Sequence, residues 1–405
     1  MGSNCFSNSS NAAVCGAYAR YNRFISKVLW VKQPPYFCKA PFRSVVVDND
    51  GMLMPCCEFM KHESSLPEYS IYEYEDYKSD TTLRQKMIDG EVDAGCAYCI
   101  AREKNGINRR EYHSRLFKEE YETFTKDTFD VRHLELRLGN LCNLKCTMCG
   151  PYASTTWSSE IKKNLTAFSE FGIDDERNDF KWINDINAIE LIKDILKNCI
   201  SVNFGGGEPL MHPSINEFLK EIDTSAQLSF NTNGTKLHNT TLELLENRPN
   251  LKIVISVDGV GKHNDYIRSG SKWNDIENNI NKLKQRNIPI SFYYILQHTS
   301  LFTFKPLFEY CVDNDIVLSI GEIYRGSVDG SGHLTLDSAH IDDVTPFENW
   351  ITKINSPREL NSPIVNNVKQ WLKSYEFNSD LHQRFRQYFE MLDFIRGTNF
   401  NETFR

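Results

Sequence analysis

The middle of the chain alternates short apolar runs with longer amphipathic segments. The first run places leucine at every second position (Leu134, Leu136 and Leu138), which is typical of a strand with one buried face. Similar runs, and the segments between them, predict a regular succession of strands and helices. The strands are expected near Leu134–Leu138, Ser201–Phe204, Leu228–Asn231, Lys252–Val257, Ile290–Leu296 and Val317–Ile320, and the helices include Ile215–Ile222, Leu242–Glu246, Trp273–Gln285 and Phe304–Val312.

This succession predicts an α/β fold. Alternating strands and helices favour a parallel sheet with right-handed crossovers. Six such units make a partial (β/α)6 TIM-like barrel, which we expect over residues 129–328. The functional loops of such a barrel gather at the C-terminal ends of its strands.

Two further regions flank the predicted barrel. Residues 1–128 hold a separate group of cysteines, and a small cluster-binding domain containing a β-hairpin is expected there, with its core at about residues 36–102. Residues 329–405 have no cysteine and are expected to be mostly helical. The strongest helix, about Asp380 to Arg396, has one apolar face and ends before Gly397, and it is predicted to serve as a packing helix.

Composition narrows the class of protein. The 405 residues are 40% hydrophobic and 25% charged, which is ordinary for a globular protein of two or three domains. A net charge of -8 disfavours nucleic acid as a default partner. No apolar run has the length of a membrane span, and the first 22 residues lack a secretory signal, so a cytoplasmic location without a membrane partner is expected. In a reducing compartment the twelve cysteines are better interpreted as metal ligands than as disulfides.

Three of these cysteines follow the first predicted barrel strand closely. Cys142, Cys146 and Cys149 form a CX3CX2C triplet with no fourth candidate nearby in sequence. Structural zinc normally takes four ligands in a closed site. On a cubane iron–sulfur cluster, three thiolates leave one iron free to bind a small molecule.

A glycine turn follows the second predicted strand. The segment Phe204-Gly205-Gly206-Gly207-Glu208-Pro209 lets backbone groups approach a ligand closely. It lacks the Gly-Lys-Ser/Thr of a phosphate-binding loop. Its carbonyl groups and the Glu208 carboxylate suit a cationic amine better than a phosphate.

The triplet, with Met148 before its last cysteine, together with the later Gly-Gly-Glu-Pro segment, resembles the radical S-adenosylmethionine (SAM) superfamily over residues 129–328. The resemblance implies that the three cysteines hold a [4Fe–4S] cluster whose fourth iron binds SAM. An external electron donor such as flavodoxin or ferredoxin would reduce the cluster. Cleavage of SAM would then yield a 5′-deoxyadenosyl radical that abstracts a substrate hydrogen.

The resemblance also implies contacts to SAM. Gly206, Gly207 and Glu208 match the segment that receives the methionyl amine, and a guanidinium suits a carboxylate as Ser or Asn suits ribose hydroxyls. The turn from Asn231 to Gly234 is equally well explained as an ordinary turn. The residues matched to SAM binding are Met148, Gly206, Gly207, Glu208, Pro209, Asn233, Ser256, Asp258, Arg268 and Gln297.

The N-terminal cysteines predict a second metal site. Two short strands around Asp48-Asn49-Asp50-Gly51 form an expected hairpin that brings Cys38 near Cys56 or Cys57, and Cys96-X-X-Cys99 completes four thiolates. Four thiolates suit a closed zinc site or an iron–sulfur site equally well on spacing.

This pattern resembles the twitch or SPASM-type auxiliary cluster domains of radical SAM enzymes. The resemblance implies one auxiliary [4Fe–4S] cluster on Cys38, Cys56, Cys96 and Cys99, with Cys57 as the rival of Cys56. In better-known members the domain follows the barrel, whereas here it precedes it. Cys199 and Cys311 lie in apolar segments and are predicted to be core residues.

The leading functional hypothesis is a radical SAM enzyme that oxidises or modifies a small sugar- or aminocyclitol-type substrate, assisted by the auxiliary cluster. A peptide- or protein-modifying maturase is the alternative within the superfamily, and a nucleic-acid modifier is a third. A non-catalytic zinc or iron–sulfur scaffold is the alternative of another class.

Overall fold

The computed structural model describes residues 33–104, 109–174, 180–323, 332–354 and 363–404. Its centre is an eight-stranded sheet with strand order β2-β1-β3-β4-β5-β6-β7-β8. All neighbouring strands pair in parallel except β1 and β2, which are antiparallel. The strands are β1 (Ser44–Val47), β2 (Leu53–Met54), β3 (His133–Arg137), β4 (Ser201–Gly205), β5 (Gln227–Thr232), β6 (Leu251–Ser256), β7 (Ile290–Leu296) and β8 (Val317–Glu322).

The predicted partial barrel is confirmed: β3 to β8 are the six expected strands, in sequence order and parallel. The two faces of the sheet differ because side chains alternate along each strand. Leu134 and Leu136 of β3 are fully buried, whereas Glu135 and Arg137 on the opposite face are half-buried. The apolar face packs under helices, and the other face is mostly polar, with a few apolar side chains such as Val46, Val254 and Ile295.

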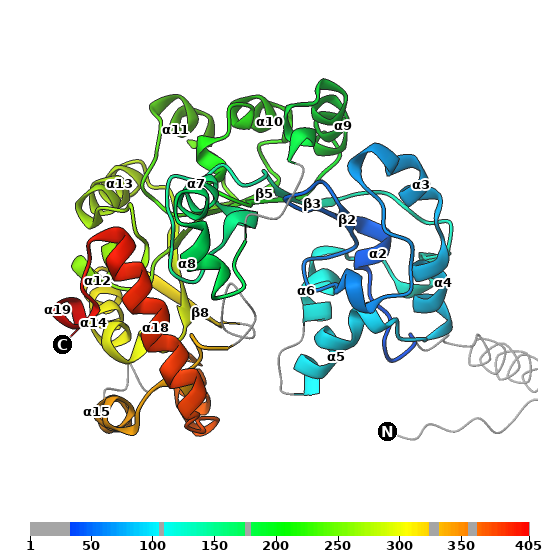
Figure 1. The fold of residues 1–405 in the computed structure, drawn as a ribbon. Coiled ribbons are helices and arrows are strands. Elements are labelled where there is room, and N and C mark those ends of the chain that lie inside the picture. Colours follow the sequence, from blue (N-terminus) through cyan, green and yellow to red (C-terminus); the bar gives the residue numbers. More distant parts are fainter. Residues whose placement is uncertain (1–32, 105–108, 175–179, 324–331, 355–362, 405) are drawn as a thin grey trace, which may run out of the picture.

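Helices cover the outer, convex side of the curved sheet (Figure 1). They follow the strands as crossovers: α9 (Ile186–Leu196), α10 (Ile215–Glu221), α11 (Asn239–Leu245), α13 (Trp273–Gln285) and α14 (Ser300–Asp313). Two shorter helices follow β3, α7 (Thr155–Lys163) and α8 (Leu165–Ser169), and α12 (Lys262–Ile267) follows β6. The main hydrophobic core lies between the sheet and the outer helices.

The N-terminal region joins the barrel through its hairpin. The expected hairpin forms from β1 and β2, but β1 also pairs in parallel with β3, Val46 opposite Glu135, so it extends the barrel sheet at its edge. The sequence did not predict this pairing. The helices of the region are α2 (Ala40–Arg43), α3 (Tyr74–Ser79), α4 (Thr82–Asp89), α5 (Ala97–Lys104) and α6 (Arg109–Leu116), with a small core of their own around Phe37, Phe42, Met87 and Phe124.

The C-terminal region is helical, as predicted, in its described parts. It contains α15 (Ile341–Thr352), α17 (Pro363–Lys373), α18 (Ser379–Arg396) and α19 (Phe400–Phe404). Helix α18 ends at Gly397, whose φ of 65° is the left-handed conformation that closes helices. Its apolar face completes a second core, made of Trp157, Ile161, Phe168, Phe171, Ile173, Tyr266, Ile267, Leu334, Phe385, Tyr388, Phe389 and Leu392.

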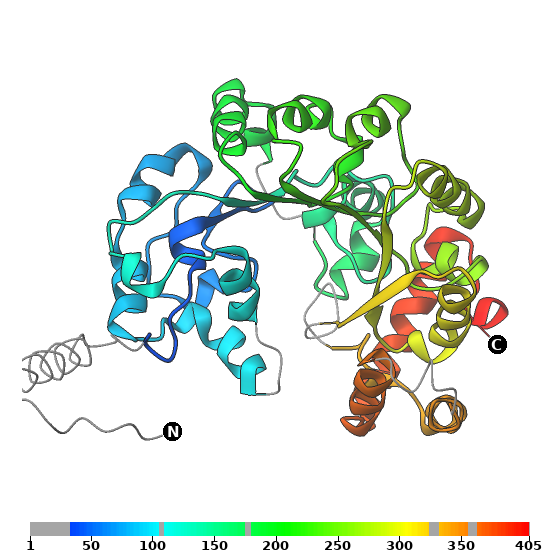
Figure 2. The same cartoon turned by 180° about the vertical axis from the view of Figure 1, so that it is seen from behind.

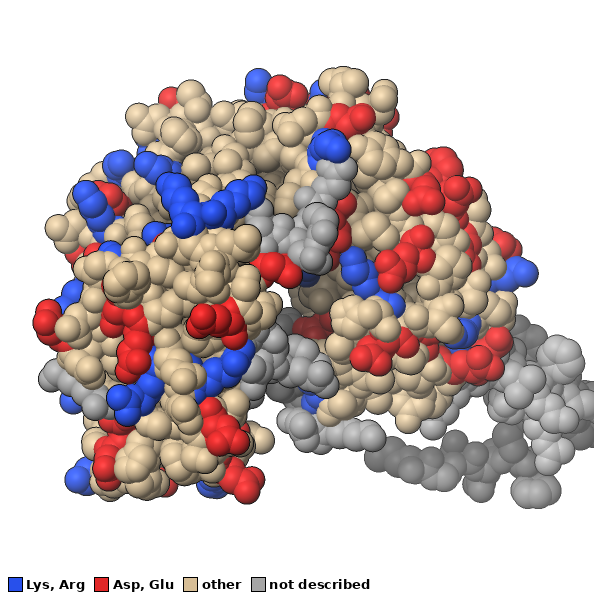
Figure 3. Space-filling model, viewed as in Figure 1, with Lys and Arg blue, Asp and Glu red and all other residues tan. Residues whose placement is uncertain are grey.

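The arch formed by the sheet leaves an open side. The N-terminal helices lie on one side and the C-terminal helices on the other, in both views (Figures 1 and 2). The space-filling view shows the molecule hollowed between these two sides (Figure 3). None of the helices in the described ranges combines the length and apolar character that crossing a membrane requires.

Candidate functional site

The CX3CX2C cysteines lie in the loop between β3 and α7, at the C-terminal edge of the sheet (residues 142–149, hereafter the triplet loop). The three thiols interact electrostatically, Cys149 with both Cys146 and Cys142. Burial raises the pKa of Cys142 to about 11 and that of Cys149 to about 12. A metal centre here would therefore displace thiol protons on binding.

Cationic and amide groups face the sulfur atoms of the triplet loop. Arg268 Nη1 lies 4.0 Å from Cys146 Sγ, and Asn233 Nδ2 lies 3.9 Å from Cys142 Sγ. The backbone amide of Leu144 lies 3.5 Å from the same Cys142 sulfur. Donors of this kind favour the thiolate form, which is the form that binds iron.

The glycine turn after β4 packs directly on the triplet loop. Gly207 N donates to Gly139 O at 2.9 Å, and Glu208 N donates to Leu141 O at 2.7 Å. Gly206 has a φ of 99°, which favours glycine, and a Cβ there would lie 2.7 Å from the Leu138 nitrogen. The structure thus brings the two sequence motifs into one surface.

Glu208 connects the turn after β4 to the turn after β5. Its side chain is buried and accepts hydrogen bonds from Thr232 Oγ1 at 2.7 Å, Asn233 N at 2.6 Å and Leu210 N at 3.2 Å. Burial raises the pKa of Glu208 to about 7 although these donors oppose the shift. A carboxylate has about four acceptor sites, so one remains for a ligand cation.

Asp258 and Arg268 form a buried ion pair behind Cys146. Arg268 Nε lies 2.7 Å from Asp258 Oδ2, in an orientation that makes an ion pair and not an aligned hydrogen bond. Asp258 is fully buried, and burial raises its pKa while the Arg268 charge opposes the shift. Arg268 is therefore already paired, and its remaining guanidinium atoms face the triplet loop.

Gln297 has the strongest sign of a missing ligand. It follows β7 at the same edge of the sheet and is 1% exposed, yet neither atom of its carboxamide has a hydrogen-bond partner among the described residues. A buried amide without partners costs free energy, so such a group commonly serves a ligand. Ser256 is half-buried and is the last residue of β6, the strand next to β7 in the sheet.

The remaining matched residues have structural contacts. Pro209 is buried at the first position of a short 3-10 helix, Pro209–Met211, where a proline stabilises the turn. Asn233 orders its own turn by accepting from Thr235 N at 2.9 Å and by donating to Asn143 Oδ1 at 3.0 Å. Met148 is half-buried against the second core.

The residues present fit a [4Fe–4S] cluster with SAM. The three thiols share a strand edge with the Gln297 carboxamide, which has no hydrogen-bond partner among the described residues, and with the spare acceptor site of Glu208. Which of the matched residues contact SAM remains a prediction.

Sequence reasoning missed a contribution from the N-terminal hairpin. Asp48, which follows β1, pairs with Arg137 of β3 at 3.0 Å, and Asn49 Nδ2 donates to Tyr152 O at 3.1 Å. Asn49 Oδ1 is buried without a hydrogen-bond partner among the described residues and lies beside Gly206. The available signal was the polar face of β3, on which Glu135 and Arg137 alternate with the buried Leu134 and Leu136.

The N-terminal cysteines also gather. Electrostatic interactions link Cys56 with Cys38 and Cys96, and Cys99 with both of these. Cys57 is exposed, which favours Cys56 as the fourth member. Burial raises the pKa of Cys38 and Cys96 to about 12. Within the described ranges, no three His, Cys, Asp or Glu residues surround a single metal-ion position.

The other cysteines and the histidine next to the glycine turn have structural roles. Cys199 and Cys311 are buried in the main core, as predicted. His212 follows the short 3-10 helix and accepts from Ser214 N at 3.2 Å, so it orders the approach to α10.

Comparison with known proteins identifies the barrel. Residues 136–311 match the sequence model of the Radical SAM superfamily, so this part of the chain is a radical SAM domain. An uncharacterised protein of Methanocaldococcus jannaschii is 26% identical over 181 residues, which cover 42% of this chain and 55% of that protein. The chain therefore spans about half the length of this curated relative.

Two solved structures are similar in fold. One is anSMEcpe with bound AdoMet, with 17% identity and a TM-score of 0.39 over 54% of this chain and 59% of that chain. The other is Streptococcus suis SuiB bound to the precursor peptide SuiA, with 14% identity and a TM-score of 0.40 over 78% of this chain and 69% of that chain.

Proposed function

We propose that the chain, with a radical SAM domain at its centre, is an enzyme that cleaves SAM reductively and abstracts a hydrogen atom from a small polar substrate. One observation carries this proposal. The three thiols of the triplet loop and the Gly206–Glu208 turn, which are far apart in sequence, form one surface at the C-terminal edge of the sheet. This is the edge at which barrels of this class bind their ligands.

Specific residues would hold the cofactors. Cys142, Cys146 and Cys149 would bind the cluster, and the Gly206–Glu208 turn would receive the SAM amine. The carboxamide of Gln297 would form hydrogen bonds with SAM. When bound, these cofactors would supply a radical, while the chain contributes orientation and exclusion of water. Flavodoxin or ferredoxin would supply the electron.

The concave face of the sheet favours a polar substrate. Glu135, Asn203 and Ser229 lie side by side on β3, β4 and β5, and Ser229 Oγ donates to Asn203 Oδ1 at 2.8 Å. Asn231 and Tyr293 are exposed on the same face. Such a row of hydroxyl, amide and carboxylate groups suits the hydroxyl groups of a sugar or aminocyclitol.

The N-terminal thiols would hold an auxiliary [4Fe–4S] cluster. Cys38, Cys56, Cys96 and Cys99 supply four ligands, so this site would be closed to substrate. Cys99 belongs to helix α5, which lies beside the open side of the arch (Figure 1). A cluster beside this helix could accept an electron from a substrate radical and make the net reaction an oxidation.

Anaerobic purification tests the proposal. The protein should be brown, contain about eight iron atoms per chain, and release 5′-deoxyadenosine when it is reduced with SAM. Cys146→Ala should abolish this release, and Cys311→Ala, a matched core cysteine, should not. Colourless protein loaded with zinc would favour the scaffold interpretation instead.

The substrate class is tested by stimulation of SAM cleavage. Sugar and aminocyclitol panels should raise 5′-deoxyadenosine release above the uncoupled rate, and Cys96→Ala should keep the uncoupled rate while losing product. If only peptides raise 5′-deoxyadenosine release, the substrate would be a peptide and not a small molecule.

A further inference from the structure

The carbonyl groups of the triplet loop accept hydrogen bonds from side chains. Thr156 Oγ1 donates to Cys142 O at 3.2 Å and to Leu144 O at 2.6 Å. Trp157 Nε1 donates to Cys146 O at 2.8 Å. These donors come from the first turn of α7, which follows the loop after a short 3-10 helix at Pro151–Ala153. Side-chain donors on every second carbonyl fix the path of a loop that has no regular structure.

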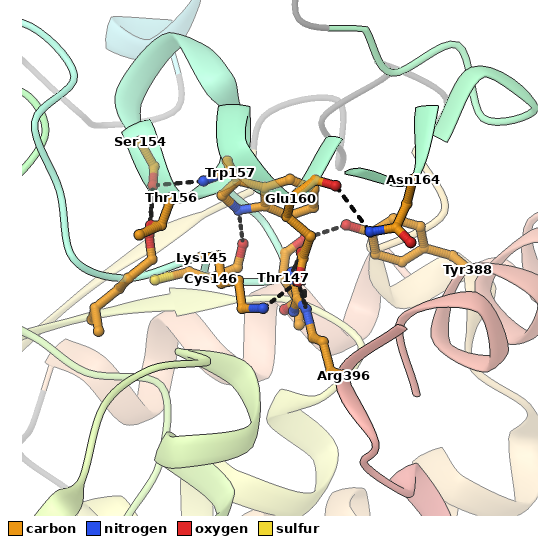
Figure 4. A network of polar contacts seen from close by, with 11 residues as sticks. Lys145, Cys146, Thr147, Ser154, Thr156, Trp157, Glu160, Asn164, Tyr388 and Arg396 are labelled. Carbon is orange, nitrogen blue, oxygen red and sulfur yellow. Dashed lines mark hydrogen bonds and ion pairs between the residues drawn. The ribbon is translucent and has the colours of Figure 1, made fainter. Parts of the chain in front are cut away.

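One donor comes from the far end of the chain. Tyr388 of α18 is fully buried, and its hydroxyl donates to Thr147 O at 2.7 Å across 241 positions of sequence. Thr147 lies between Cys146 and Cys149, so this bond holds the part of the triplet loop between two of the three thiols (Figure 4). On the other side of the same residue, Thr147 N donates to Ile267 O at 2.8 Å.

A chain of charges makes the second link to α18. Arg396 contacts Glu160 of α7 through two nitrogens, with Nη2 at 2.7 Å and Nε at 3.2 Å from Oε2. Glu160 also pairs with Lys145, which lies within the triplet loop. The Arg396 and Glu160 side chains are 3% and 5% exposed, so solvent screens the pair little.

The guanidinium of Arg396 also lies over the indole of Trp157, 5.1 Å from the ring centroid. The same indole donates to Cys146 O. Arg396 therefore supports the loop at two places, through Glu160 to Lys145 and through Trp157 to Cys146 (Figure 4). In this network two cations share one carboxylate, so positive charge remains next to the thiols.

Apolar contacts also connect the triplet loop to α18. Met148 and Cys149 pack against the second core, to which α18 contributes Phe385, Tyr388 and Phe389. This core is separate from the main core between the sheet and the outer helices. The triplet loop thus rests on the C-terminal helix, whereas the main barrel core does not include that helix.

From these contacts we infer that α18 is part of the cluster-binding apparatus, with Tyr388 and Arg396 as positioning residues. Tyr388 fixes the backbone between Cys146 and Cys149. Arg396 holds Lys145 and Trp157 and keeps a positive charge beside the thiols. That charge stabilises the reduced, more negative cluster and so raises its reduction potential. The electrochemical part rests on the proposed function, and the backbone part does not.

Hydrogen exchange in the metal-free full-length protein tests the backbone part. Tyr388→Phe removes only the hydroxyl and should make the amides of residues 147–149 exchange about fivefold faster. The matched control is Tyr375→Phe, because Tyr375 Oη donates to Ala339 O at 2.8 Å elsewhere in the C-terminal region. Equal exchange in the triplet loop of both variants would overturn the inference, and this result does not depend on a cluster.

Potentiometry followed by electron paramagnetic resonance tests the charge. In reconstituted protein, Arg396→Gln should shift the reduction potential of the SAM-binding cluster to more negative values. Arg396→Lys keeps the positive charge, so its potential should stay close to that of the wild type. The control is Arg386→Gln, since Arg386 lies on the same helix but is 66% exposed. An unshifted potential in Arg396→Gln would remove the electrostatic role, whereas absence of any cluster in the wild type would contradict the proposed function.

Discussion

Gly207 lies so close to Leu141 that a Cβ on the glycine would be 2.4 Å from the Leu141 carbonyl oxygen. The neighbouring Glu208 N donates to that same oxygen at 2.7 Å. The φ of Gly207 is not in the left-handed region, so the glycine serves close approach and not an unusual backbone. The contact joins the turn after β4 to the triplet loop.

Gly207→Ala should therefore separate the two motifs. Backbone displacement of this kind costs about 1–3 kcal/mol, and bound iron and SAM affinity should fall with it. Urea unfolding and iron analysis measure both effects. Gly205→Ala is the control, because a Cβ at Gly205 meets its nearest atoms, in Arg137 and Asn231, only at 4.0 Å. Equal effects of the two substitutions would argue against the close contact.

Gln297→Met should have opposite effects on stability and on binding. The substitution removes a buried amide without partners, so the metal-free protein should gain about 1 kcal/mol in unfolding free energy. The loaded protein should lose SAM affinity about tenfold, as for one lost hydrogen bond. Calorimetric titration and urea unfolding check the pair of results, with Gln285→Met as an exposed control. A loss of stability would contradict the proposed role.

Arg268→Gln should destabilise the fold because it leaves a buried carboxylate unpaired. Asp258 is fully buried, and Arg268 Nε lies 2.7 Å from it. The expected cost at pH 8 is about 3 kcal/mol by urea unfolding. Adding Asp258→Asn should recover part of it, since the stranded charge is removed. A double variant less stable than Arg268→Gln would show that the ion pair is not the cause.

The two adjacent cysteines of the hairpin should differ in iron binding. Cys56→Ser should lower bound iron from about eight to about four atoms per chain, because Cys56 interacts with Cys38 and Cys96. Cys57→Ser should leave the iron content unchanged, since Cys57 is exposed. Iron and sulfide analysis of reconstituted protein decides between them, and the reverse result would assign Cys57 as the ligand.

His212 should make the fold acid-sensitive. Burial lowers the pKa of this imidazole from 6.5 to about 4, so the unfolded chain takes up the proton first as the pH falls. The stability difference between the wild type and His212→Asn should be constant above about pH 7 and should change by about 3 kcal/mol, to the disadvantage of the wild type, by about pH 4. Asn keeps an acceptor for Ser214 N. Parallel stability curves of the two proteins would contradict this prediction.

Local patterns predicted much of the architecture. The period-two leucines of β3 and the apolar run of β7 identified strands because burial of one or both faces leaves a local trace. The strand Ile290–Leu296 and the helix Trp273–Gln285 have the predicted bounds. The cysteine triplet was visible for the same reason, since its spacing lies within one loop.

Contacts between distant segments left no such trace. The pairing of β1 with β3 places Asp48 and Asn49 beside the glycine turn. The local sequence of β1 and β2 predicts only a hairpin and gives no sign that β1 also joins the barrel sheet. The burial of the Gln297 carboxamide likewise depends on what surrounds it.

The sequence by itself determined the strands, their order along the chain and the residue types that can bind metal, because these depend on periodicity and spacing between near neighbours. Only the tertiary structure decided that α18 supports the triplet loop. Tyr388 and Thr147, which form a hydrogen bond, are 241 positions apart in the sequence. The apolar face of an amphipathic helix shows that the helix packs against the protein, but it does not show which surface the helix packs on.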